Sequence, residues 1–263
     1  PGGEFLAAVE GLLAEKIVIE RLGRYVFFGR ENLADENRQP ELWIARKLRA
    51  ARKVAQWLAR ISAVRFVALC NTTALGHARD VGDLDFFVIC RAGRLMSTRA
   101  LAVLPYKFLK RRPGDGNSRD AVCLSYFVTD EGLDLSSHQL PSSTFHLPHS
   151  SHYDDPYFRY WFLSLLPLYD DGVSSDLWRA NQTITRRHAQ ARKWEVPPDL
   201  RVEAPRVRIP LPGRLEPWAA KFQTRAFPPA IRELLNRDTR VMATDKVLKF
   251  HVDDRREYYR QRY

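Results

Sequence analysis

The sequence predicts an α+β fold in which a mixed α/β sheet is flanked by helices. Three apolar runs of strand length, at residues 64–69, 83–90 and 121–128, are the candidates for its central strands. Segments with helical spacing of apolar residues, such as 40–61 and 95–104, lie before and between them. Because helices, strands and loops alternate along this part of the chain, we expect the helices to pack on the faces of the sheet.

The composition is that of a folded, strongly basic protein. Of the 263 residues, 45% are hydrophobic, and the formal net charge is +11. This hydrophobic content excludes a globally disordered chain. The charge favours a polyanionic partner, namely nucleic acid, nucleotide phosphates or an anionic membrane surface, although a merely solvated basic surface gives the same count.

The cysteines and the hydropathy pattern predict a cytoplasmic protein without a membrane span. Cys70, Cys90 and Cys123 are an odd, scattered set in or beside apolar runs, which does not indicate a disulfide framework. No signal peptide is recognisable, and no apolar run approaches the ~20 residues of a transmembrane helix. The opening Pro1-Gly2-Gly3 leaves open whether the sequence starts inside a longer protein.

Residues 1–38 are predicted to form a small N-terminal unit of one helix and a β-hairpin. Residues 4–15 have helical spacing, and residues 16–28 have strand propensity on both sides of a break. A helix followed by a hairpin resembles the end of a winged helix. One interpretation is therefore a DNA-contacting wing with Arg21 and Arg24 at its tip, and the other is a winged-helix remnant that serves only for packing.

Residues 39–135 are predicted to form the core domain. Its first helix is expected to start at Pro40, and its buried stripe includes Leu48, Ala51 and Leu58. The rest of this helix is basic, which is typical of a solvated surface and also of a phosphate-binding one. The basic residues are Arg46, Lys47, Arg49, Arg52, Lys53 and Arg60. The second helix, at 95–104, is expected to end at Pro105.

Residues 136–263 are predicted to be a helical C-terminal region with an extended, proline-rich linker around 194–217. The expected helices are 156–168, 175–193, 215–226 and 229–236. Three equally spaced histidines before them, His146, His149 and His152, suggest either a metal site or a plain loop. For His251, the two interpretations are a general base and a structural ion-pair cluster with its acidic neighbours.

The sharpest chemical signal is Asp83-Leu84-Asp85 at the start of the second apolar run. Residues i and i+2 of a strand point to the same face, so the two carboxylates are expected to stand side by side. Carboxylates at that separation repel each other unless a cation or a proton lies between them. Mg²⁺ typically takes one or two carboxylates together with substrate phosphates, so the pattern predicts a metal–nucleotide site.

Several short segments together carry a family resemblance. They are Thr73–Ala78, Gly82–Asp85, Arg94-Leu95, Cys123–Phe127, Phe250-His251 and Asp254–Arg256. A strand, a short polar turn, about a dozen residues and then Asp-x-Asp opening a strand resembles the DNA polymerase β-like nucleotidyltransferase superfamily. More closely, the chain is similar to a family of uncharacterised bacterial and archaeal nucleotidyltransferase-domain proteins, from about Lys16 onward.

The resemblance implies a function and a set of site residues. The turn at Asn71, Thr72 and Thr73 would bind the nucleotide's phosphates, and Asp83 and Asp85 would act as the catalytic and metal-binding pair. The implied cofactor is Mg²⁺, or Mn²⁺ in its place, with a nucleoside triphosphate (NTP) as substrate. An acceptor hydroxyl would attack the α-phosphorus and release pyrophosphate. RNA such as tRNA, a protein or a small molecule would supply that hydroxyl, with the basic surface favouring nucleic acid.

Two departures from the family pattern keep a second hypothesis open. Asn71 stands where the pattern has Gly, and Thr72 where it has Ser. The third carboxylate found in many members is missing from 121–128, where Ser125 is central and Asp120 lies only at the edge. The alternative function is therefore a catalytically degenerate nucleotidyltransferase fold that binds nucleic acid or a partner protein.

Overall fold

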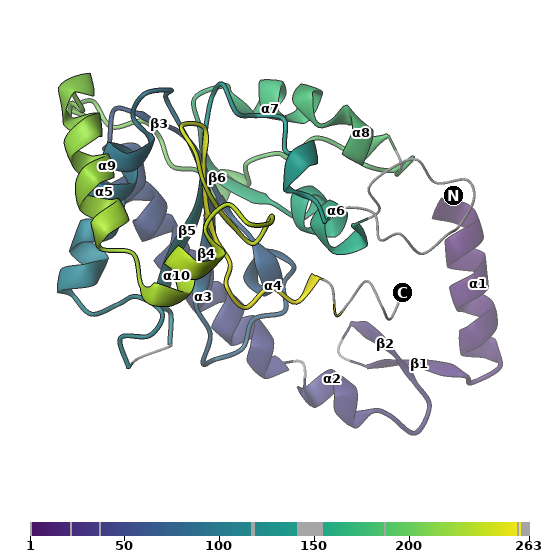
Figure 1. Cartoon of the computed structure of the whole chain (residues 1–263). Helices are drawn as coiled ribbons and strands as arrows, with labels where there is room; N and C mark the ends of the chain where they lie inside the picture. Colours follow the sequence, from purple (N-terminus) through teal and green to yellow (C-terminus); the bar gives the residue numbers. More distant parts are fainter. Residues whose placement is uncertain are drawn as a thin grey trace.

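A six-stranded mixed sheet forms the centre of the molecule and confirms the predicted α+β class (Figure 1). The computed structural model describes residues 2–21, 23–36, 38–116, 119–140, 155–186, 188–256 and 258. The strands are β3 (Val64–Leu69), β4 (Leu84–Cys90), β5 (Val122–Thr129), β6 (Leu166–Asp170), β7 (Val241–Ala243) and β8 (Val247–Phe250). Their order is β6-β3-β4-β5-β8-β7, in which β4 and β5 are parallel and the other neighbours are antiparallel.

Each face of the sheet carries its own hydrophobic core. The central strand β4 reads LDFFVIC and is apolar on both faces, as a strand covered on both sides must be. Phe86 and Val88 point into one core, and Phe87 and Ile89 point into the other. All four side chains are at most 1% exposed.

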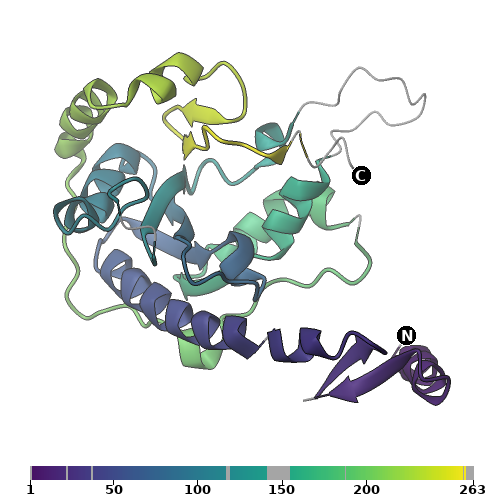
Figure 2. The same cartoon turned by 90° about the horizontal axis from the view of Figure 1, so that it is seen from below.

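Helices cover both faces of the sheet (Figures 1 and 2). The first core contains residues of α3 (Arg38–Ala59) and α5 (Leu95–Phe108), and α9 (Glu216–Arg225) packs against α5. The second core contains residues of α6 (Pro156–Leu163), α7 (Ser174–Ala180) and α8 (Gln182–Thr185). The short α4 (Asn71–Ala74) follows β3, and α10 (Pro229–Leu234) precedes β7.

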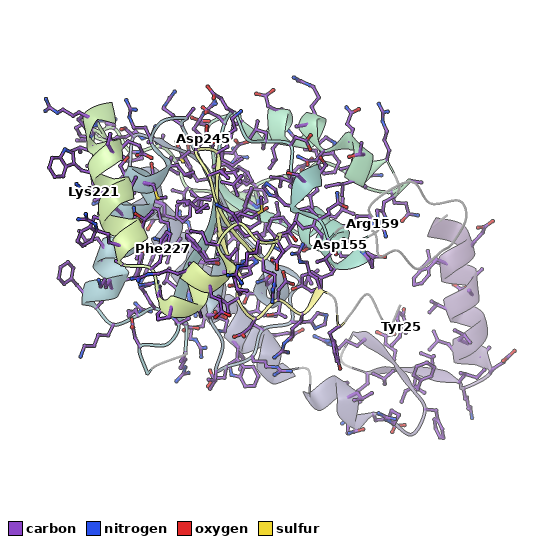
Figure 3. The ribbon with its side chains drawn as sticks, viewed as in Figure 1. Tyr25, Asp155, Arg159, Lys221, Phe227 and Asp245 are labelled. Carbon is purple, nitrogen blue, oxygen red and sulfur yellow. The ribbon has the colours of Figure 1, made fainter. Side chains whose placement is uncertain are left out.

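The N-terminal helix and hairpin are present as predicted. They comprise α1 (Gly2–Ala14), β1 (Val18–Arg21) and β2 (Arg24–Phe27), and α2 (Asn32–Glu36) joins them to α3. Both views show this unit beyond one end of α3, and Tyr25 of β2 lies well away from the main sheet (Figures 1, 2 and 3). Arg24 is ion-paired with Glu41 of α3, so one of the two tip arginines is used for packing.

Two predicted helix ends were wrong. Helix α5 continues past Pro105 to Phe108, because the residues after the proline are held by bonds such as Leu109 N–H to Pro105 O at 2.9 Å. The predicted helix 156–168 ends at Leu163, and its last residues form β6. Pro167 within β6 is tolerated because β6 is an edge strand of the sheet.

The C-terminal region is not only helical, because β6, β7 and β8 belong to the same sheet as the core strands. The predicted helix 175–193 is reduced to α7 and α8, with residues 188–193 outside any helix. Short strands such as β7 and β8 give weak sequence signals, since three or four residues show little periodicity.

The proline-rich linker wraps around the core as predicted. It contains only two short 3₁₀ turns, Pro198–Leu200 and Gly213–Leu215. The Arg208 guanidinium donates to the carbonyl oxygens of Ala59, Ile61 and Val64 at 3.1, 3.0 and 2.7 Å. These bonds satisfy carbonyls at the end of α3 and fix the connection from α3 to β3.

Candidate functional site

A pocket of about 670 Å³ lies on the second face of the sheet, at the start of β4 and β5. Four predicted site residues line it, namely Asn71, Thr72, Asp83 and Asp85. Thr73 does not belong to its lining and is 4% exposed within α4. The other lining residues are Cys123, Ser125, Tyr126, Tyr157, Phe158, Trp161 and Lys249 to Arg256.

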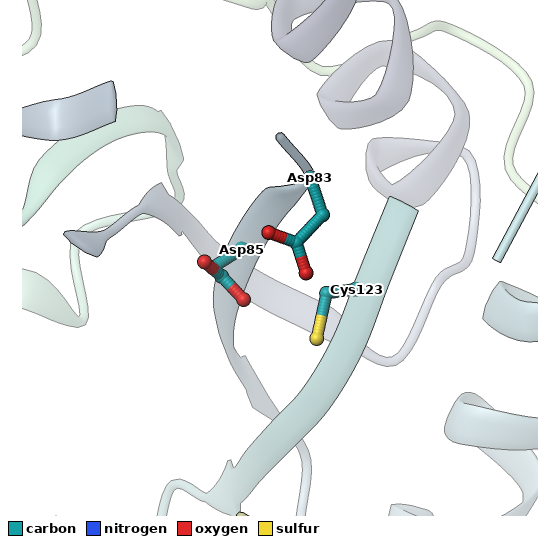
Figure 4. A group of neighbouring side chains, drawn as sticks. All are labelled: Asp83, Asp85 and Cys123. Carbon is teal, nitrogen blue, oxygen red and sulfur yellow. The ribbon is translucent and has the colours of Figure 1, made fainter. Parts of the chain in front are cut away.

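Asp83, Asp85 and Cys123 converge in the pocket (Figure 4). One ligand atom of each lies within 4.8 Å of the others. Asp85 of β4 stands directly opposite Cys123 of β5 in the parallel register. Cys123 was missed in the sequence because only its strand partner reveals its place, although the alternation of 122–125 puts it on the open face with Ser125.

A bulge in β5 brings an additional side chain of this strand into the lining of the pocket. Asp85 pairs with Cys123, but Phe87 pairs with Tyr126, so β5 has one more residue than β4 over this interval. Bulges re-aim side chains and are common beside active sites. Here the extra residue lets Cys123, Ser125 and Tyr126 all line the same pocket.

The electrostatics of the site suit a divalent cation. Burial, and after it the negative charge of Asp83, raise the pKa of Asp85 to about 6. Burial and the charge of Asp85 raise the pKa of the Cys123 thiol well above its usual range, so this group keeps its proton at neutral pH. Two crowded carboxylates could hold Mg²⁺ or Mn²⁺, which prefer oxygen ligands to sulfur.

Asn71 has the backbone conformation that the turn after β3 requires. Its φ is +61°, a left-handed conformation that Gly and Asn adopt more readily than other residues. Its side chain lowers the pKa of Asp85 and so opposes part of the effect of burial on that carboxyl. Asn71 therefore supplies the backbone shape expected of Gly, and it places an amide beside one of the two carboxylates.

A buried lysine of α3 holds the residue before β4 in place through hydrogen bonds. Lys47 was expected on the solvated face of α3, but its side chain is fully buried. Its Nζ donates to Gly82 O at 2.6 Å and to Asp120 Oδ1 at 2.8 Å. The backbone N–H of Asp120 donates to the same Gly82 oxygen at 2.9 Å, so two donors fix the residue that precedes Asp83.

Arg46 extends this support to the loop before the site. Its Nη1 lies 2.6 Å from Asp80 Oδ1, and its Nε lies 3.0 Å from Asp120 Oδ2. Burial raises the pKa of Asp120, but the hydrogen bonds from Lys47 and Arg46 outweigh it and leave the pKa below the usual range. Asp120 is thus an ion-pair partner and does not stand in for the third carboxylate.

The opposite wall of the pocket is the segment after β8. The His251 ring lies edge-on to Tyr126, with 5.8 Å between ring centroids. Burial and the charge of Lys249 lower the pKa of His251 to about 3, so the ring is neutral. The ion-pair cluster of this segment is built by Arg256, which bonds Asp254 at 2.7 Å and Asp155 at 3.2 Å. His146, His149 and His152 lie outside the described residues.

Replacing the buried lysine should loosen this end of β4. Lys47→Met is expected to lower the free energy of unfolding by about 2–4 kcal/mol, because it removes the donor that Asp120 and Gly82 O share. Chemical denaturation measures the change. Lys53→Met on the exposed side of the same helix is the control and should stay within about 0.5 kcal/mol of the parent. Equal losses in the two variants would contradict the supporting role of Lys47.

Substitutions at Asn71 should separate backbone shape from side-chain chemistry. Asn71→Ala is expected to cost about 1–2 kcal/mol of stability, because alanine disfavours a φ of +61°. Asn71→Gly should stay within about 0.5 kcal/mol, since glycine accepts that conformation. Thermal or denaturant unfolding of both variants tests this, and a glycine variant as unstable as the alanine one would refute it.

Asp85→Asn is expected to stabilise the metal-free protein at neutral pH. The folded-state pKa of Asp85, about 6, exceeds its unfolded value of 3.8. The unfolded chain therefore loses this proton first as the pH rises, and stability falls between about pH 4 and 6. Asparagine does not titrate, so at pH 7.5 the free energy of unfolding of the variant should exceed that of the parent by about 2 kcal/mol. Near pH 4 this difference should disappear. Denaturation in EDTA at both pH values decides; a variant that is less stable at pH 7.5 would contradict it.

Comparisons with known proteins do not supply a family. No family model matches the chain, and no curated protein matches it. Within the described ranges, no helix combines the length and apolar character that a membrane crossing requires.

Proposed function

We propose that the chain is a Mg²⁺-dependent nucleotidyltransferase, which moves a nucleoside monophosphate from an NTP to an acceptor hydroxyl. The observation that carries the proposal is the convergence of Asp83 and Asp85 beside Asn71 and Thr72 in one pocket. Its volume of about 670 Å³ lies within the ~300–1,000 Å³ usual for small-molecule sites.

The residues of the pocket have distinct roles in this proposal. Asp83 and Asp85 hold the metal, and the raised pKa of Asp85 marks a charge that a cation would relieve. Bound there, Mg²⁺ or Mn²⁺ would neutralise charge on the triphosphate. The Thr72 hydroxyl and the backbone at the start of α4 face the phosphates. The acceptor oxygen forms the new bond to the α-phosphorus, and pyrophosphate leaves.

The acceptor proposed first is RNA, including tRNA. The net charge of +11 favours a polyanion over a neutral small molecule or an average protein surface. Protein and small-molecule hydroxyls are the competing acceptors.

One observation favours the alternative function, a degenerate fold that only binds nucleic acid or a protein. The Asn71 side chain lines the pocket together with Asp83 and Asp85, and it occupies space that phosphates would have to enter. In addition, the carboxylate nearest the start of β5, Asp120, is engaged by Lys47 and Arg46. Nucleotide binding discriminates between the two functions.

Titration with ATP and with CTP in the presence of Mg²⁺ is the decisive measurement. Calorimetry should detect binding to the parent protein, and Asp83→Asn should weaken it at least tenfold by removing a metal ligand. Asp245→Asn, at the exposed turn between β7 and β8, is the matched control and should bind like the parent (Figure 3). If neither nucleotide binds with Mg²⁺ or Mn²⁺, the enzyme proposal fails.

Transfer of labelled NTP to total RNA and to total protein then identifies the acceptor class. The label should appear in RNA with the parent protein and be absent with Asp83→Asn. RNA binding that falls with salt but is unchanged in Asp83→Asn, without any transfer, would support the binding module instead.

A further inference from the structure

A buried lysine lines the same pocket as the two aspartates, and among the described residues it forms no ion pair with a carboxylate. Lys249 lies on β8, its side chain is 2% exposed, and it stands directly opposite Tyr126 of β5. Its Nζ donates to Thr239 O at 2.7 Å. An ammonium group has three N–H donors. Among the described residues, Lys249 uses one of them, for the bond to Thr239 O.

The register places Lys249 on the same sheet face as the candidate metal site. Asp85 is opposite Cys123, Phe87 is opposite Tyr126, and Tyr126 is opposite Lys249. Residues directly opposite each other on neighbouring strands share a face. Strand β8 is two strands from β4, or roughly 10 Å across the sheet, and Asp85 lies two residues, or about 7 Å, along β4 from the row that contains Lys249. The backbone positions of Asp85 and Lys249 are therefore roughly 12 Å apart, which one extended substrate can span.

The carboxylates near Lys249 are already engaged by another cation. Arg256 bonds Asp254 through Nε at 2.7 Å and Asp155 through Nη1 at 3.2 Å. Asp155 lies at the start of α6, where it also accepts from the N–H of Phe158 (Figure 3). Burial, and after it the charge of Arg256, lower the pKa of Lys249 to about 7. A buried cation in this situation lacks a counterion that a ligand could supply.

We propose that Lys249 is an anion-binding residue of the pocket and contacts a phosphate group of the substrate. Lys249 belongs to the lining of the pocket, and its Nζ lies 5.7 Å from the centre of the Tyr126 ring, which also lines it. The bond to Thr239 O leaves two N–H donors of this group for a ligand, and His251 and Arg255 line the same pocket. That this phosphate belongs to a nucleotidyl-transfer substrate rests on the function proposed above. It comes from one of two sources, the non-transferred phosphates of the NTP or a phosphate of the acceptor.

The first experiment tests the anion site without metal. Sulfate and inorganic pyrophosphate are titrated in EDTA into the Asp83→Asn/Asp85→Asn protein, where no metal-bound triphosphate can form. Both anions should bind, and adding Lys249→Met should weaken binding at least tenfold. Lys249→Arg, which keeps the charge, should restore most of it. Lys246→Met, exposed on the same hairpin, is the control and should leave binding unchanged.

Affinity should also depend on pH in a defined direction. Sulfate does not titrate in this range, so its binding should weaken from pH 6 to pH 8.5 as Lys249 loses its proton, and the pH dependence should vanish in Lys249→Arg. The other charged and titratable groups around Lys249 are Arg256, Asp254, Asp155, Asp238, His251, His138 and Tyr126. Equal sulfate binding by the parent and by a folded Lys249→Met protein would overturn the proposal.

A second arm assigns the source of the phosphate. The protein with intact aspartates is saturated with Mg²⁺ and a non-hydrolysable NTP analogue, and sulfate binding is repeated. Displacement of sulfate assigns Lys249 to the triphosphate, whereas simultaneous binding assigns it to the acceptor. Failure of the analogue to bind would refute the nucleotidyltransferase proposal, but sulfate binding that needs Lys249 would still establish the anion site.

Discussion

The buried ion pair between Lys47 and Asp120 is the contact on which the candidate site depends. Asp83 and Asp85 repel each other, so the backbone that presents them has to be fixed by other interactions. Lys47 supplies these by joining α3, the start of β5 and the Gly82 carbonyl in one buried contact. A lysine at this place costs desolvation, but it gives the oxygen of Gly82 and the Asp120 carboxylate a common donor. The contacts of Lys47 with the core thereby keep Asp83 and Asp85 close together against their mutual repulsion.

The residues that line the pocket come from distant parts of the chain. The acidic wall is built by β4, whereas the opposite wall is built by β8 and the segment that follows it. Arg256 holds that segment in place through Asp155 and Asp254. Arg256 engages both carboxylates, and the hydrogen bond of Lys249 within the described part of the chain goes to a backbone carbonyl, Thr239 O. The ion pairs that hold this segment therefore also occupy two carboxylates that lie near Lys249.

The sequence predicts those parts of the structure that depend on local residue patterns. Long apolar runs predicted β3, β4 and β5, and the spacing of Asp83 and Asp85 placed both on one face of the pocket. What it missed depends on partners in space. Cys123 becomes a neighbour of Asp85 only through the parallel register, and Lys47 is buried because Asp120, distant in the sequence, meets it. The strands β7 and β8 were missed because their sheet position, not their sequence, makes them strands.

Asn71 joins the fold of the turn to the chemistry of the site. Its φ of +61° is a left-handed conformation, which asparagine adopts with little strain. Its side chain lowers the pKa of Asp85 and so opposes part of the effect of burial on that carboxyl. Under the proposed function, the same side chain takes up room that a glycine would leave free for phosphate oxygens. The balance at this residue is therefore between stabilising the charge of Asp85 and admitting phosphate.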